Sequence, residues 1–151
     1  MTSRESTSGL NPILVIAYGN PLRNDDGVAW RVAELLRQKF PASQTICVHQ
    51  LTPDLAQDVS QAAVVVFIDA EDTENPGRVR CQGISPKREE FSFSHHLTPS
   101  ALLGLSETLY GSAPRATLVA ISGENFDHGE ILSEYVAHAL PQVSGEIVKH
   151  L

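Results

Sequence analysis

The chain has 151 residues, of which 42% are hydrophobic, and it carries a formal net charge of -7 at pH 7. This length suits one globular domain with a sizeable core and leaves little room for a second. The acidic balance argues against a surface that neutralises nucleic-acid phosphates or anionic lipid, so we expect neither a nucleic acid nor a membrane as a partner.

The N-terminal segment predicts a flexible tail. Residues 1–11 are rich in Ser and Thr and contain no apolar core of signal-peptide length. We therefore expect a tail at 1–11 and one folded domain at 12–151. No segment of the chain has the run of about 18 apolar residues that a membrane span needs.

The first half of the domain alternates between strand and helix patterns. The apolar run at 13–18 predicts a buried strand, and a Gly-Asn-Pro turn follows it at 19–21. Apolar side chains recur at helical spacing over 28–40, as in an amphipathic helix. The same criteria predict strands at 45–51 and 62–68, with a short helix between them that Thr52 and Pro53 begin.

The second half continues this alternation. Strands are predicted at 78–84 and 117–121, where β-branched and apolar residues are concentrated. Thr98 and Pro99 supply a cap and a first residue for another helix. Ser133 caps a last helix, in which Pro141 predicts a kink or a division into two helices.

The order of these elements predicts the fold class. The run at 62–68 is unbroken, which is typical of a central strand covered on both faces. Strands alternate with helices throughout, so we predict an α/β fold: a three-layer sandwich with a mainly parallel central sheet, in a single domain. Cys47 and Cys81 lack the spacing of a disulfide framework or a zinc site, and they indicate thiols in a reducing compartment. We expect a cytoplasmic protein.

Acidic residues follow two of the predicted strands. Asp25 and Asp26 come soon after the first strand, and Asp69 closes the apolar run at 62–68. In open α/β sheets the functional crevice lies outside the carboxyl ends of the strands. We therefore expect these side chains to lie together at that end of the sheet, which we call the rim. A charge after seven apolar residues needs a partner. For Asp25 and Asp26 a second interpretation stays open, because acidic residues near a helix start also complement the helix dipole.

Two adjacent histidines precede the helix that begins at Thr98. His95 and His96 bring imidazole groups to the same rim, and at most one is expected to be a ligand because adjacent side chains do not easily point the same way. Two carboxylates and one imidazole suit a divalent transition metal ion, and three protein ligands leave positions open for substrate or water. The chain lacks a dinucleotide-binding or phosphate-loop motif, so we expect no nucleotide cofactor.

A receiver domain is an alternative with a similar acidic rim. Its acidic pair follows the first strand immediately, whereas residues 19–24 intervene here. A receiver also needs a lysine after its fifth strand, and the strand at 117–121 is followed by Ser-Gly-Glu-Asn. A non-catalytic receiver-like signalling module, or a metal-binding chaperone module, remains the second hypothesis.

The whole pattern resembles the hydrogenase maturation endopeptidases, which trim the C-terminal tail of nickel-iron hydrogenase large subunits. The resemblance covers most of the chain from Ile13 onward. It rests on Gly19-Asn20 after a strand, Asp25-Asp26-Gly27 at a helix start, Asp69-Ala70 after the buried strand, and Ser94-His95-His96 before a helix. Where many members carry an Asp-Gly-Gly-Thr turn, this chain has His49-Gln50-Leu51-Thr52.

The resemblance implies an endopeptidase that removes the C-terminal extension of a nickel-loaded large-subunit precursor. In the family the nickel is already inserted into the precursor, so it arrives with the substrate and is not a resident cofactor. Matched by position, the implied catalytic and metal-contacting residues are Asp26, Asp69 and His96, with Gly19, Asn20, Asp25 and His95 in loop or supporting roles. The oligomeric state stays open.

Overall fold

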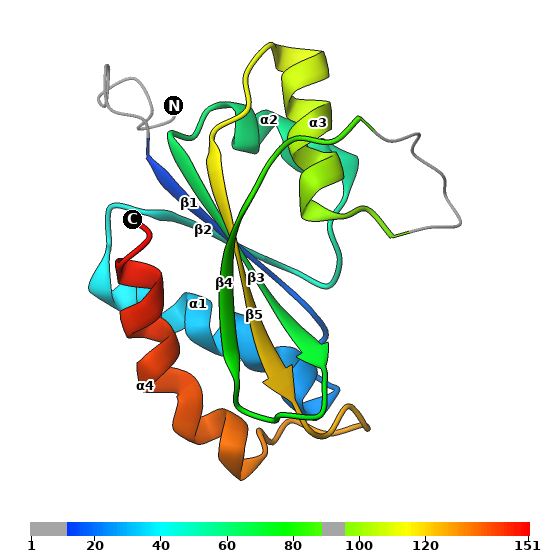
Figure 1. The fold of residues 1–151 in the computed structure, drawn as a ribbon, viewed down its shortest axis with the longest axis vertical. Helices are drawn as coiled ribbons and strands as arrows, with labels where there is room; N and C mark the ends of the chain where they lie inside the picture. The colour runs from blue at the N-terminus through cyan, green and yellow to red at the C-terminus, as the bar shows by residue number, and fades with distance from the viewer. Residues whose placement is uncertain (1–11, 89–95) are drawn as a thin grey trace.

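One sheet runs through the middle of the molecule (Figure 1). The computed structural model describes residues 12–88 and 96–151. Within these residues the strands are β1 (Ile13–Tyr18), β2 (Gln44–Val48), β3 (Val64–Asp72), β4 (Val79–Ile84) and β5 (Arg115–Gly123). They lie in the order β2-β1-β3-β5-β4, and every neighbouring pair is parallel except β4 with β5, which is antiparallel.

Helices cover both faces of the sheet (Figure 1). α1 (Val28–Lys39) and α4 (Glu134–Val148) pack on one face, and α2 (Ala56–Ser60) and α3 (Pro99–Tyr110) pack on the other. Short 3-10 turns, η2 (Asn24–Gly27) and η3 (Pro53–Leu55), precede α1 and α2. The predicted three-layer α/β sandwich with a mainly parallel sheet is therefore confirmed. Across the described residues, we find no helix with the length and apolar character that a membrane crossing demands.

The central strands bury side chains on both faces. Val15 of β1 and Val66 of β3 pack against the layer of α1 and α4, whereas Leu14 and Phe67 pack against α2 and α3. All four side chains are almost fully buried. Burial of such a side chain stabilises the fold by roughly 1.5–3 kcal/mol, which explains why these strands lack the polar alternation of half-exposed strands.

The strand that carries Asp69 is longer than predicted. β3 continues to Asp72, so the expectation that Asp69 closes the strand is wrong. The reason is that the two neighbours of β3 have different lengths: pairing with β1 stops at Ile68, whereas pairing with β5 continues to Asp72. Asp69 therefore lies at the first position where β3 has a paired strand on one side only.

The predicted helix starts are placed correctly, although two of the three predicted caps act differently. Thr98 accepts a hydrogen bond from the backbone N–H of Ala101 at 3.1 Å, as a cap should. Thr52 and Ser133 occupy the cap positions before η3 and α4, but neither side chain makes a capping bond. α4 runs through Pro141 as one helix, so the predicted division does not occur. The tail predicted at 1–11 lies outside the described residues.

Candidate functional site

The sheet has a switch point between β1 and β3. From β1 the chain crosses to β2 on one side, and the later strands β3 and β5 follow on the other side. In doubly wound sheets, ligands bind outside the carboxyl ends of the strands at such a point. The loop 19–27 follows β1 at this point, and Asp69 lies on β3 beside it.

The loop 19–27 holds Asp26 through backbone geometry. Gly19 has φ +147°, a conformation that side chains rarely adopt, and a Cβ there would collide with the carbonyl oxygen of Asp26. The backbone N–H of Asn20 donates to Asp26 Oδ2 at 2.7 Å, and Asn20 Oδ1 accepts from the N–H of Leu22 at 2.9 Å. Gly19 and Asn20 thus give the loop a turn that orients the half-buried Asp26.

Asp69 is half-buried, and its carboxylate is repelled by the negative charge of Asp26. Burial, followed by the negative charge of Asp26, raises the pKa of Asp69 to about 7. Hydrogen bonds from the backbone of Ala70 and from the hydroxyl of Tyr18 oppose this rise but do not cancel it. A carboxyl group with this pKa exchanges its proton near neutral pH, which is suitable for acid–base chemistry or for binding a cation.

Tyr18 was missed by the sequence analysis. Burial, and then the charge and hydrogen bond of Asp69, raise the pKa of Tyr18 well above its usual value, so its hydroxyl stays a donor. The parallel register pairs Ala17 with Ile68, and the next residues on the two strands are Tyr18 and Asp69. The signal lies in this register, which a single sequence does not reveal.

Asp25 has a different environment from its neighbour. It is fully buried, and its carboxylate accepts hydrogen bonds from the backbone N–H groups of Glu124, Asn125 and Ser133 and from the Ser133 hydroxyl, at 2.7–2.9 Å. Burial alone would raise the pKa of Asp25, but these four bonds hold it below its ordinary value. Asp25 therefore anchors the loop between β5 and α4.

Asn24 anchors the same loop and was also missed by the sequence analysis. It adopts a left-handed conformation, with φ +45°. Its Nδ2 donates to the carbonyl oxygen of Asp127 at 3.0 Å, and its Oδ1 accepts from the N–H of Ile131 at 3.1 Å. The Asn-Asp pair at 24–25 therefore joins the start of α1 to the loop before α4.

Among the described residues, the structure does not place the predicted histidine ligand His96 in one cluster with Asp26 and Asp69. His96 is exposed, two residues before the cap of α3, and His95 lies outside the described residues. Within the described parts of the chain, the ligand atoms of Asp26, Asp69 and His96 do not all lie within 4.8 Å of one another. The structure thus places the two carboxylates close enough to interact electrostatically. The metal site formed by Asp26, Asp69 and His96 stays a prediction.

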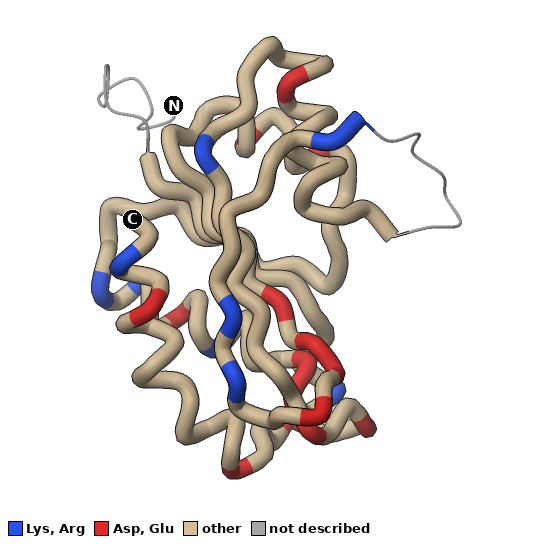
Figure 2. Tube along the Cα trace, in the orientation of Figure 1, with Lys and Arg blue, Asp and Glu red and all other residues tan. Residues whose placement is uncertain are grey.

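Acidic residues surround the switch point. Figure 2 shows red segments gathered at the lower end of the sheet, where β3 and β5 end and the loop toward α4 begins. Glu71 of β3 forms an ion pair with Arg80 of β4, with Arg80 Nη2 2.9 Å from Glu71 Oε2. A concentration of negative charge attracts cations and repels anionic ligands.

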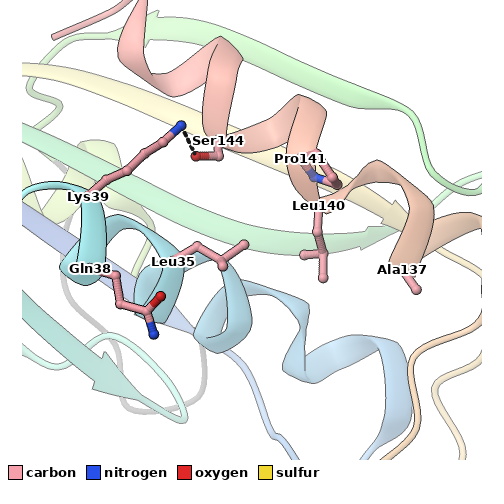
Figure 3. Close-up of a pocket in the computed structure, with 7 residues that line it drawn as sticks. All are labelled: Leu35, Gln38, Lys39, Ala137, Leu140, Pro141 and Ser144. Atoms are coloured by element: carbon pink, nitrogen blue, oxygen red, sulfur yellow. Dashed lines mark hydrogen bonds between the residues drawn. The ribbon is translucent and has the colours of Figure 1, made fainter.

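A groove elsewhere in the molecule is separate from this rim. It holds about 600 Å³ between α1 and α4 and is lined mainly by apolar side chains, among them Leu35 and Leu140 (Figure 3). At one end, Lys39 Nζ donates to Ser144 Oγ at 3.2 Å. The lining of this groove includes none of the residues predicted for the functional site.

The fold is shared with solved maturation proteases. No family model matches the chain, and no curated protein matches it in sequence. The structure is similar to the [NiFe] hydrogenase maturation protease HybD from Thermococcus kodakarensis, with a TM-score of 0.71, 23% identity, and coverage of 92% of this chain and 98% of that one. The structure is also similar to the hydrogenase maturating endopeptidase HybD from E. coli. The TM-score is 0.69, the sequence identity is 19%, and the match covers 93% of this chain and 91% of that one.

A third similar structure is the [NiFe] hydrogenase maturation protease HycI from Thermococcus kodakarensis. It has a TM-score of 0.69, 20% identity, and coverage of 98% of this chain and 97% of that one. The likeness therefore extends over nearly the whole of each chain. This confirms, at the level of the fold, the resemblance found in the sequence.

Proposed function

We propose that the chain is an endopeptidase that removes the C-terminal extension of a nickel-loaded hydrogenase large-subunit precursor. The observation that carries this proposal is the carboxylate pair of Asp26 and Asp69 at the switch point. Support also comes from the fold, which is that of hydrogenase maturation proteases. The pair occupies the position where a doubly wound sheet binds its ligands.

The proposed role of the pair is to recognise the nickel that the precursor carries. The negative charge of Asp26 disfavours ionisation of Asp69, so a divalent cation between them would relieve the repulsion and favour the ionised form. Carboxylate oxygens are suitable ligands for such an ion, and an exposed imidazole at His96 would add a nitrogen ligand. The donor set therefore fits nickel as part of the substrate.

This arrangement would make cleavage depend on metal loading. The precursor's nickel, bound by Asp26 and Asp69, would hold the adjacent peptide bond beside the carboxylate pair and lower the entropic cost of its hydrolysis. The same ion would polarise the scissile carbonyl or a water molecule. A precursor without nickel offers nothing that offsets the repulsion between the two carboxylates, so it would bind weakly.

The alternative of a receiver-like module is less well supported. Receiver domains follow the strand order 2-1-3-4-5 in a doubly wound sheet. Here β4 is an antiparallel edge strand, and β5 takes the position beside β3. We place the proposed reaction in the cytoplasm, for which the two free cysteines, Cys47 and Cys81, give support.

The decisive experiment compares nickel-loaded and nickel-free precursor. The purified chain is mixed with each, and the mass of the precursor is measured over time. We expect the loaded precursor alone to lose its C-terminal extension. A chaperone module would bind metal without shortening the precursor, and this result would contradict the proposal.

Substitutions of the two carboxylates test whether the pair is needed for cleavage. Asp69→Asn and Asp26→Asn should each lower the cleavage rate at least about a hundredfold, because each removes a ligand charge. Asp72→Asn is the matched control, since Asp72 is an exposed aspartate on the same strand. Full cleavage by a folded Asp69→Asn protein would overturn the assignment.

A further inference from the structure

A group of side chains of metal-ligating types lies away from the carboxylate pair of Asp26 and Asp69. It consists of Cys81 on β4, Glu146 on α4, and His150 just after α4. Their potential ligand atoms, one from each residue, all lie within 4.8 Å of one another. β4 is the edge strand two positions away from β3, so this group is distinct from the carboxylate pair.

The elements that carry these residues pack together. Cys81 pairs with Val119 in the antiparallel register of β4 and β5, and its side chain packs against the apolar layer that α1 and α4 cover. Glu146 and His150 are four residues apart. The chain keeps a helical turn between them, because the N–H of His150 donates to the carbonyl oxygen of Ile147 at 2.9 Å. Side chains at this spacing lie on one side of a helix.

We propose that Cys81, Glu146 and His150 bind a divalent transition-metal ion of the zinc class. A thiolate, an imidazole and a carboxylate form a donor set that suits Zn²⁺ or Co²⁺, with water as the fourth ligand. Tetrahedral bonds of about 2.0–2.3 Å place ligand atoms about 3.3–3.8 Å apart, so side-chain movements of about 1 Å close the site. His150 is exposed and Glu146 is half-exposed, which leaves both free to make these movements.

Binding would exchange a proton for the metal. Burial, and then the charge of Glu146, raise the pKa of the Cys81 thiol, so the thiol is protonated while the site is empty. The ion displaces this proton to solvent and bonds to the resulting thiolate. Lys149 Nζ lies 3.2 Å from Glu146 Oε1, but the pair is largely exposed and contributes little. The bound ion would tie the end of α4 to the edge strand β4.

Cobalt titration of the full chain tests this site. Wild-type protein should bind Co²⁺ with a thiolate-to-metal absorption band, and Zn²⁺ should displace the Co²⁺. Cys81→Ser should abolish the band, and His150→Gln should weaken binding at least about tenfold. The matched controls are Cys47→Ser, the other cysteine, and His138→Gln, an exposed histidine on α4, the helix that carries Glu146. Both should bind Co²⁺ as the wild type does.

The possible failures are distinguishable. Absence of the band in wild-type protein, or its persistence in Cys81→Ser, would overturn the proposal. If Cys81→Ser does not fold, His150→Gln decides, because an exposed residue tolerates substitution; wild-type affinity in this variant would overturn the proposal. Asp69→Asn should keep the band whether or not the chain cleaves a hydrogenase precursor, so the two proposals fail separately.

Discussion

Ser133 and Asp25 are 108 residues apart in the sequence and are joined by two hydrogen bonds. The backbone N–H of Ser133 donates to Asp25 Oδ1 at 2.7 Å, and its hydroxyl donates to Asp25 Oδ2 at 2.7 Å. The carboxylate is fully buried, so these bonds are shielded from water. They connect the start of α1 to the start of α4 and thereby set the shape of the rim.

Asp25→Asn should destabilise the protein by about 1–3 kcal/mol. An amide replaces one acceptor oxygen with a donor, so at least one of the four N–H or O–H donors loses its partner. The free energy of unfolding, measured with urea, checks this expectation. Asp127→Asn, an exposed change in the same loop region, is the control. Equal stability of the two variants would show that the buried bonds contribute nothing.

The contribution of Asp25 should also depend on pH. Its pKa is lowered in the folded state, so its stabilisation is present above the unfolded value of about 3.9 and is lost as pH falls through the folded value. Wild-type protein should therefore lose its stability advantage over Asp25→Asn below about pH 4. Urea unfolding at pH 3 and pH 7 measures the difference, and an unchanged advantage at pH 3 would contradict the pKa direction.

Asp26 and Tyr18 should move the pKa of Asp69 in opposite directions. Asp26→Asn removes a repulsive charge, so the pKa of Asp69 should fall below about 7. Tyr18→Phe removes a hydrogen bond to the carboxylate, so the pKa of Asp69 should rise. Carboxyl ¹³C chemical shifts followed against pH report both changes. Changes of the same sign in the pKa of Asp69 in the two variants would contradict the opposing effects of Asp26 and Tyr18.

Asp69 should make the stability fall as pH rises. Its pKa is raised in the folded state, so its contribution is fully present below about pH 3.9 and is lost as pH rises through about 7. Relative to Asp69→Asn, wild-type protein should lose on the order of 2 kcal/mol of unfolding free energy between pH 4 and pH 8.5, less than the whole shift because the carboxyl is partly exposed. Parallel pH profiles for the two proteins would contradict this.

Gly19→Ala should destabilise the protein by about 2 kcal/mol or more. The substitution forces a side chain into the φ +147° conformation and against the carbonyl oxygen of Asp26. Gly145→Ala on α4 is the control, because a Cβ there meets no atom within 4 Å and should stabilise the helix by about 0.5–1 kcal/mol. Thermal unfolding of both variants provides the comparison, and similar melting temperatures would refute the steric account.

The strands and helices could be predicted because their signals are local. The apolar run that ends at Tyr18 and the Thr98-Pro99 start of α3 match the structure residue by residue. The end of β3 could not be predicted, because its extension to Asp72 depends on pairing with β5, which lies more than 40 positions further along the chain. Strand length is a property of the partner as well as of the segment.

The candidate site was predictable only in part. The positions of Asp26 and Asp69 at one rim follow from the rule that parallel strands end at the same edge. The division of roles between Asp25 and Asp26 did not follow, since two adjacent aspartates look alike in a sequence. Asp25 turns toward Glu124 and Ser133, and Asp26 accepts a bond from the loop at Asn20.

The sequence by itself determined the alternation of strands and helices, the fold class and the rim on which the acidic residues lie, because hydrophobic periodicity and turn residues act over short distances along the chain. Only the tertiary structure decided that Asp25 is an anchor, that Tyr18 donates to Asp69, and that Cys81 meets the end of α4. Burial, hydrogen-bond partners and pKa values depend on segments that are far apart in the chain and meet only when it folds.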